Sequence, residues 1–386
     1  MAGAILERKL TTAGIGRVKF DVARQTDDSE IRSLLRENPI PGRISISLER
    51  EPDYFADAGL PGEAKQTIVA RDGGRMVSVG CCAFRLRFVN GRSLRVGYLG
   101  SLRLDARYGG RFDILRRGYE FFHELQTDAP ADFYFTSIAA DNQRARQFLE
   151  RGVHGIPLYE FVGEFVTLLV PTCHSSRAKN ARASKWKIDR GSSASADINK
   201  LVGLLNEHNN ACQFAPCWSA AELNTLQPLG LEASDFCIVS NGERISACGA
   251  LWDQRSFRQT VIRQYAPSLA FVRPVFNAFA RIVDQPRLPA VGETLANAFA
   301  SHVATRTDEA SVLIGLVEQL RSIANQRGIE LLTLGFAVNN PRLATVRHNF
   351  RHREYRSRLY VVRWPDIGGA ARELDDRFLA PEAALL

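Results

Sequence analysis

An internal repeat limits what this chain can fold into more than any other feature of its sequence. Two amphipathic segments lie 170 residues apart, and each places an acidic residue before an apolar stripe and a glutamate after it. The matched pairs are Asp27 with Asp197, Ile31 with Leu201, Leu34 with Leu204, Leu35 with Leu205, and Glu37 with Glu207. Further matches follow in the same order: Ile68-Val69 with Ile238-Val239 and, at an offset of 198, Ala139, Asn142 and Arg144 with Ala337, Asn340 and Arg342. A tandem duplication of one α/β unit accounts for this order better than two unrelated amphipathic helices.

The hydropathy pattern of the first unit predicts a mixed sheet with helices on both faces. Six segments have the period of a strand or are short apolar runs, and the other periodic segments have a helical stripe. The predicted strands are 17–23, 66–70, 76–89, 95–104, 132–140 and 158–170. The predicted helices are 26–38, 53–58, 114–125 and 141–151. This order indicates an α/β fold in which each unit has a mixed, mostly antiparallel sheet.

The domain boundaries follow from a change in composition. Residues 171–184, PTCHSSRAKNARAS, are polar, basic and poor in apolar side chains, which is typical of a linker. We therefore predict a first domain over 17–170, a second over 185–364, and a C-terminal tail over 365–386.

Composition indicates a soluble globular protein. The chain has 386 residues, of which 45% are apolar and 24% charged, and its net charge of +8 favours an anionic partner such as a phosphorylated cofactor. The odd count of seven cysteines, without a metal-ligand spacing, favours reduced thiols and no metal. Charges interrupt the apolar run of the first sixteen residues, so we expect no signal peptide, no membrane segment and a cytoplasmic location.

Two glycines between arginines follow the predicted strand 95–104. The run is Arg107-Tyr108-Gly109-Gly110-Arg111, and a helix is predicted after it. Unpaired N–H groups at the start of a helix attract phosphate, and glycine lets the phosphate approach the backbone closely. Taken alone, the run could equally be a plain turn.

The surrounding residues resemble those of the GNAT-type N-acetyltransferase superfamily. The resemblance rests on Leu102-Arg103-Leu104 and Asp105, on Tyr108-Gly109-Gly110-Arg111, and on Ala139-Ala140 before Asn142-x-x-Ala145. It spans about residues 17–170, and more faintly 184–364 through the repeat. It implies that acetyl-CoA, or another acyl-CoA, binds where the strands 95–104 and 132–140 diverge. The residues that it implies for the cofactor are Leu102, Arg103, Leu104, Arg107, Tyr108, Gly109, Gly110, Arg111, Phe112, Asn142, Ala145 and Arg146.

Three positions depart from the family's usual pattern. Phe112 stands where the phosphate loop usually has a small residue, and Leu149 stands where many members have a tyrosine that protonates the leaving thiolate. Tyr98 stands where members often have a glutamate or histidine base. Because an ordinary tyrosine is a poor base at pH 7, we expect Tyr98, the candidate catalytic residue, to orient the acceptor or to relay a proton through water.

The second unit has lost the phosphate loop. Its equivalent, residues 301–308, contains no glycine, and acidic residues lie at its end. Because acidic side chains repel a pyrophosphate, we predict a degenerate unit that does not bind CoA and that shapes the acceptor pocket.

These observations favour an acyl-CoA-dependent N-acyltransferase, with acetyl-CoA as the expected donor and a small-molecule or peptide amine as acceptor. No nucleophile motif is present, so we expect direct transfer. A non-catalytic CoA-binding sensor and an aminoacyl-tRNA-dependent transferase of the same tandem fold stay open, although the dispersed arginines disfavour nucleic acid. An oligomer is possible.

Overall fold

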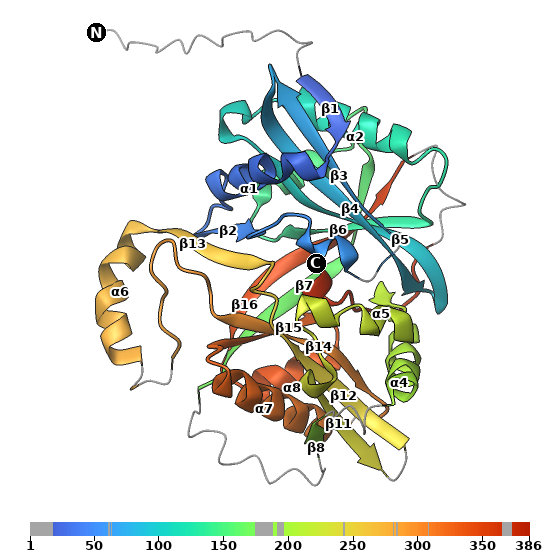
Figure 1. Cartoon of the computed structure of the whole chain (residues 1–386), viewed down its shortest axis with the longest axis vertical. Helices are drawn as coiled ribbons and strands as arrows, with labels where there is room; N and C mark the ends of the chain where they lie inside the picture. The colour runs from blue at the N-terminus through green and yellow to red at the C-terminus, as the bar shows by residue number, and fades with distance from the viewer. Residues whose placement is uncertain are drawn as a thin grey trace.

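A single large sheet runs through both halves of the molecule (Figure 1). The structure is a computed structural model, and it describes residues 18–60, 62, 64–173, 188–190, 197–241, 244–280, 282, 285–307, 309–364 and 373–386. The sheet has 13 strands, in the order β1-β3-β4-β5-β6-β16-β7-β15-β14-β12-β11-β8, and β10 pairs with β4. Most of the predicted linker, 174–184, lies outside the described residues.

The six predicted strands of the first unit are confirmed, but a strand at Ile44–Glu49 was not predicted, and the helix predicted over 53–58 is a short 3-10 helix at Ala56–Gly59. Its strands are β1 (Val18–Val22), β2 (Ile44–Glu49), β3 (Ala64–Asp72), β4 (Arg75–Val89), β5 (Arg92–Leu104), β6 (Phe133–Ala139) and β7 (Leu158–Pro171). Its helices are α1 (Asp28–Glu37), α2 (Phe112–Leu125) and α3 (Gln143–Leu149). Along β3, Val69 packs with α1, whereas its neighbours Ile68 and Ala70 pack with the clusters that contain α2. Because successive side chains of a strand point to opposite faces, α1 and α2 cover opposite faces, as predicted.

The second half repeats this order. Its strands are β8 (Ile188–Arg190), β9 (Cys212–Gln213), β10 (Ala215–Pro216), β11 (Phe236–Asn241), β12 (Arg244–Trp252), β13 (Gln259–Tyr265), β14 (Asn297–Thr305), β15 (Leu331–Ala337), β16 (Arg353–Arg363) and β17 (Phe378–Leu379). Its helices are α4 (Ile198–Asn210), α5 (Ala220–Asn224), α6 (Pro267–Ala280), α7 (Ala310–Gln326) and α8 (Pro341–Asn349). The buried stripe of α7 packs on β12, β14 and β15 in the largest core cluster.

The two halves exchange their last long strands. The strand β16 of the second half lies between β6 and β7 of the first, and β7 lies between β16 and β15 of the second. Ser357 of β16 pairs with Ala139 of β6, and Leu331 of β15 pairs with Pro171 of β7. Neither half therefore has a separate sheet, and the boundaries 17–170 and 185–364 describe the sequence repeat. As limits of independent domains they stay predictions.

The parallel strand pair of each half diverges after a short contact. The β5–β6 ladder runs from Val96↔Phe133 to Leu99↔Thr136, and beyond it the two strands no longer pair with each other. The β14–β15 ladder ends likewise at Phe299↔Thr333. The β4–β5 and β12–β14 ladders each have a bulge at the same point. The bulged residues Ser101 (φ 54°) and His302 (φ 53°) have left-handed backbone conformations. The two halves thus share a strained backbone conformation at the bulge, which a comparison of their amino-acid sequences does not show.

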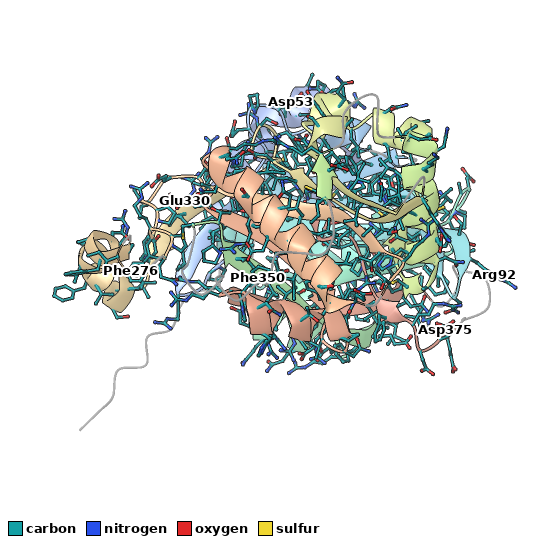
Figure 2. All side chains as sticks on the ribbon, turned by 90° about the horizontal axis from the view of Figure 1, so that it is seen from below. Asp53, Arg92, Phe276, Glu330, Phe350 and Asp375 are labelled. Atoms are coloured by element: carbon teal, nitrogen blue, oxygen red, sulfur yellow. The ribbon has the colours of Figure 1, made fainter. Side chains whose placement is uncertain are left out.

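Two segments of the second half extend beyond the repeated unit. The first contains β13, which pairs with β2 of the first half, and α6, which stands away from the body around Phe276 (Figure 2). Residues 373–386 return to the centre of the molecule, where the last residue lies (Figure 1). In this segment β17 pairs with β9, and Ala383 lies against Gly335 of β15. None of the helices among the described residues is long and apolar enough to cross a membrane.

The packing of the exchanged strand can be tested at Gly335. A Cβ atom there would lie 2.5 Å from the ring of Phe165 on β7 and 2.8 Å from Cβ of Ala383. We expect Gly335→Ala to lower the free energy of unfolding by about 1–3 kcal/mol, because a well-packed core does not accommodate added bulk. Gly203→Ala is the control, since nothing lies within 4 Å of its Cβ position in α4. It should raise stability by about 0.5–1 kcal/mol. Urea unfolding measures both, and an unchanged Gly335→Ala would contradict this packing.

Candidate active site

A cavity of about 770 Å³ opens where β5 and β6 diverge. Its walls include the ends of both strands, the inner side of α2, and residues of the second half such as Gln254 and Tyr355. Because the β5–β6 ladder stops at Leu99↔Thr136, peptide groups beyond it need other partners. An extended ligand with amide groups, such as pantetheine, can supply them as an added strand would.

The structure brings about half of the predicted site residues to this cavity. Those that line it are Tyr98, Leu102, Arg103, Leu104, Asn142 and Ala145. The Asn142 side chain caps α3 as expected, and its Oδ1 accepts from the Ala145 N–H at 3.2 Å. The others, Arg107, Tyr108, Gly109, Gly110, Arg111, Phe112 and Arg146, do not line the cavity as described.

The glycine loop has less free charge than its sequence indicates. Arg107 pairs with Asp105, and Arg111 forms two hydrogen bonds of 2.7 and 2.8 Å with Asp113. The N–H groups of Tyr108, Gly109, Arg111 and Phe112 donate to carbonyls within the loop. Each of the two loop arginines is therefore paired with a carboxylate two residues away, and Asp105 is shared with Arg75.

Gly110 and Arg144 are the parts of this region that stay available. Gly110 has a φ of 98°, and its N–H makes no hydrogen bond within the described residues. The Arg144 guanidinium is exposed and lies 4.0 Å from the Gly110 Cβ position. Arg146, by contrast, donates to the Ala140 carbonyl and pairs with Glu150. An anion at Gly110 would thus meet Arg144 rather than the predicted Arg146.

Phe112 forms one side of the loop without filling it. Its ring is 50% exposed and stacks on Phe148, with 4.4 Å between centroids. Its bulk therefore points to α3, so the space next to Gly110 stays open.

Tyr98 presents a free hydroxyl to the cavity. Its ring packs on Phe135 at 5.0 Å, and its Oη has no hydrogen-bond partner among the described residues. Burial raises the pKa of Tyr98 to about 12, although Arg258 and Arg87 act in the opposite direction. The phenol is therefore protonated at neutral pH and can donate a hydrogen bond but cannot act as a base.

A set of buried cations on the cavity wall was missed by the sequence analysis. It comprises Arg50, Lys65, Arg85, Arg87 and Arg258. The one local signal is in β4, where Arg85 and Arg87 alternate with the apolar residues Phe84, Leu86 and Phe88. Arginines at alternate positions of a core strand indicate a buried polar surface.

In the second half, the chain's own tail occupies the equivalent divergence. The His302 N–H at the bulge donates to Glu382 Oε2 at 3.1 Å, while Ala383 contacts Gly335 on the other strand. Gln254 Nε2 donates to the Ala384 carbonyl at 2.9 Å. This gives a physical reason for the prediction that the second unit does not bind CoA, since the tail lies in the divergence and the His302 N–H already has a partner. Asp308 of the predicted acidic loop lies outside the described residues.

The fold has clear counterparts among solved structures. The sequence matches no protein-family model and no curated protein sequence. N-myristoyltransferase of Saccharomyces cerevisiae, solved with bound myristoyl-CoA, covers 94% of this chain and 88% of its own at a TM-score of 0.60 and 11% identity. A GCN5-related N-acetyltransferase from Sphaerobacter thermophilus covers 92% and 98% at 0.53 and 12% identity. A GCN5-related glucosamine N-acetyltransferase region of a fungal β-N-acetylglucosaminidase covers 89% and 38% at 0.56 and 14% identity.

These likenesses define the class of fold. The chain has the mixed α/β fold of the GNAT type, as the resemblance in its first half implied. Two of these solved structures cover more than nine-tenths of the chain, so the structural similarity includes the second half as well.

A pair of glycine variants tests the phosphate site. Gly110→Glu should abolish stabilisation by acetyl-CoA, because it puts a negative charge beside Arg144 where we expect the pyrophosphate. Saturating acetyl-CoA, at 100 times its dissociation constant, should add about 2.7 kcal/mol to the wild-type chain. Thermal unfolding with and without acetyl-CoA measures the difference.

Gly292→Glu is the matched control. Gly292 also has a left-handed φ, of 89°, with nothing within 4 Å of its Cβ position, and it lies in the second half between α6 and β14, away from the glycine loop and this cavity. Both variants carry the same backbone strain, so only the ligand response should differ. Full acetyl-CoA stabilisation of Gly110→Glu would show that the phosphates bind elsewhere.

Proposed function

We propose that this protein is an acyl-CoA-dependent N-acyltransferase. The observation that carries the proposal is the cavity at the diverging strands, with Ser101 of the bulge in its wall and the available loop position Gly110 six residues beyond the end of β5. In this proposal the acyl-CoA extends between β5 and β6, with its pyrophosphate near Gly110 and Arg144. The amine enters from the side of the second half.

The bulge supports a position for the thioester carbonyl. The His302 N–H occupies the equivalent place in the second half and donates to a carboxylate oxygen. By the repeat, the Ser101 N–H is the matching donor for an oxygen ligand in the first half. A donor held there would stabilise the negative charge that develops on the thioester oxygen as the amine attacks.

The reaction is direct transfer in this proposal. The amine nitrogen forms a bond to the acyl carbon as the carbon–sulfur bond breaks, and the amine loses one proton while the CoA thiolate gains one. Tyr98 lines the cavity and is protonated, so in this proposal it would orient the amine or donate to the leaving sulfur. Leu149, which stands at the usual acid position, is buried and cannot donate.

The length of the acyl chain is a separate part of the proposal. Acetyl-CoA is the donor that the sequence resemblance implies. The side of the cavity under α2 is apolar and includes Leu115, Tyr119 and Phe122, so it also offers a wall for a longer chain. Thermal stabilisation by acyl-CoAs of increasing length measures which chain the wall accepts.

Thiol release in the presence of an amine library tests the activity itself. A non-catalytic CoA sensor is the second candidate, because Leu149 and the high pKa of Tyr98 leave no evident acid–base pair. Stabilisation by acyl-CoA without thiol release would favour the sensor, and the absence of both would overturn either function.

Cys81 provides a test of direct transfer. It lies opposite Gly100 at the bulge and lines the cavity, so an acyl-cysteine intermediate is the competing mechanism. We expect Cys81→Ala to retain kcat within a few-fold. Loss of activity by a factor of about 10³ or more, with acyl-CoA binding unchanged, would instead indicate covalent catalysis.

The pH dependence tests the role of Tyr98. Because its pKa is about 12, the phenol stays protonated from pH 6 to 10 and cannot produce a rise of rate in that range. We expect Tyr98→Phe to lower kcat about tenfold, the value of one hydrogen bond, and to keep the shape of the pH–rate profile. A rising limb that disappears in Tyr98→Phe would show that Tyr98 is the base.

A further inference from the structure

The cavity wall beyond Tyr98 has an excess of buried positive charge. Arg85 and Arg87 are only 4% and 2% exposed, and both line the cavity together with Arg50, Lys65 and Arg258. Burial lowers the pKa of Arg85 to about 10 and that of Arg87 to about 9, and Arg85 contributes to the second shift. Both guanidiniums therefore remain charged at neutral pH.

Three of these five cations have partners within the protein. Arg50 and Lys65 share the carboxylate of Asp57, whose pKa is lowered because they outweigh its burial. Arg258 donates to the main-chain oxygens of Ala384 and Leu386 at 2.8 and 2.7 Å. The positive charge of these three side chains and some of their N–H donors are therefore already paired with groups of the protein.

Arg85 has no such partner. It makes no hydrogen bond and no ion pair with the described residues, and its Nη1 is buried without an acceptor. Its guanidinium lies over the ring of Trp218, 4.8 Å from the centroid. Arg87 uses Nη1 for the Phe214 carbonyl at 2.8 Å, but its Nε is also buried without a partner.

The acids around Arg85 act on it through space but neither accepts a hydrogen bond from it nor forms an ion pair with it. Glu222 and Glu382 are the carboxyl groups that act on it electrostatically. Burial raises the pKa of Glu382, and one of its oxygens accepts from the His302 N–H. Glu222 caps α5, where it accepts from Ser219. An arginine taken out of water without an acceptor is costly to a fold, so a ligand that supplies one would bind strongly.

The phosphates of CoA cannot be this ligand if they bind at the glycine loop. Arg85 pairs with Val96 on β5, and the loop starts after Leu104. Eight residues of strand separate these positions by roughly 25 Å. The cations therefore face the opposite end of the cavity, beyond the reacting position.

We propose that Arg85, assisted by Arg87, binds a carboxylate or similar oxyanion on the amine acceptor. This inference rests on the proposed function. Arg85 lies four residues along β4 from Cys81, which is opposite Gly100 at the bulge. This spacing puts the oxyanion about 13 Å along the strand from the reacting position. An extended peptide spans that length with three or four residues, so the acceptor is a short peptide-like amine with an anionic far end.

A peptide series tests both the charge and the spacing. The probes are glycine and its peptides of two to five residues, each as the free acid and as the C-terminal amide, with acetyl-CoA as donor. We expect the free acid to exceed the amide in kcat/KM by about 10- to 100-fold at three or four residues, and by little for glycine itself. Gly-Gly-Asp-amide, which carries its carboxylate on a side chain, separates an acidic residue from a free C-terminus as the source.

Arg85→Met should remove this preference. The acid-to-amide ratio should fall to about one, while kcat/KM for the amides stays within about threefold. Arg92→Met is the matched control, because Arg92 is exposed at the outer end of the β4–β5 hairpin and lies away from the cavity (Figure 2). It should leave the ratio unchanged. Because Arg85 has no internal ion pair, Arg85→Met should also unfold at no lower temperature than the wild type. If Arg85→Met does not fold, Arg85→Gln takes its place.

Thermal stabilisation by the same peptides, in the presence of CoA, gives a readout that needs no turnover. Stabilisation by the free acids alone, lost in Arg85→Met, supports the inference. Equal kcat/KM values and equal thermal stabilisation for acids and amides at every length would overturn it. It would also be overturned if Arg85→Met lowered kcat/KM for the acids and the amides by the same factor. Failure of the proposed function is distinguishable, because acyl-CoA would then neither stabilise the protein nor release its thiol.

Discussion

The exchange of β7 and β16 is the constraint on which the rest of the structure depends. Each half contributes its last long strand to the other half's side of the sheet, so the central hydrogen bonds join residues from opposite ends of the chain. Because these contacts are non-local, neither half can bury its sheet edge without the other. The exchange also fixes the second half beside the cavity, where Tyr355 and Gln254 form part of the wall.

The diverging parallel strands and the bulge beside them occur in both halves of the protein, but in different surroundings. Both halves have diverging parallel strands and a bulge with a left-handed residue, Ser101 or His302. Diverging strands leave peptide groups that require partners. In the second half, residues 382–384 lie at this point and Glu382 accepts from the His302 N–H, whereas in the first half the divergence lines a cavity of about 770 Å³. The two halves thus share this geometry but differ in what lies beside it.

Stability and recognition oppose each other along the cavity wall. A buried arginine without an acceptor, such as Arg85, lowers the stability of the free protein and raises the affinity for an anion. The paired arginines of the glycine loop show the reverse, because Asp105 and Asp113 neutralise Arg107 and Arg111 locally. Positive charge is therefore most available at the end of the cavity away from the glycine loop, where the sequence offered only two alternating arginines in β4.

Local patterns of the sequence predicted an internal repeat and most of the order of strands and helices, and the family resemblance implied the GNAT-type fold and the place where β5 and β6 diverge. Periodicity, caps such as Asn142 and short-range spacing are features that a linear pattern records. Tertiary structure alone decided that β16 lies between β6 and β7, that residues 382–384 fill the second divergence, and that Arg144 rather than Arg146 lies by Gly110. It also decided which arginines have partners. The reason is physical: strand pairing and the solvation of a charge depend on residues far apart in the chain, whose meeting no local pattern encodes.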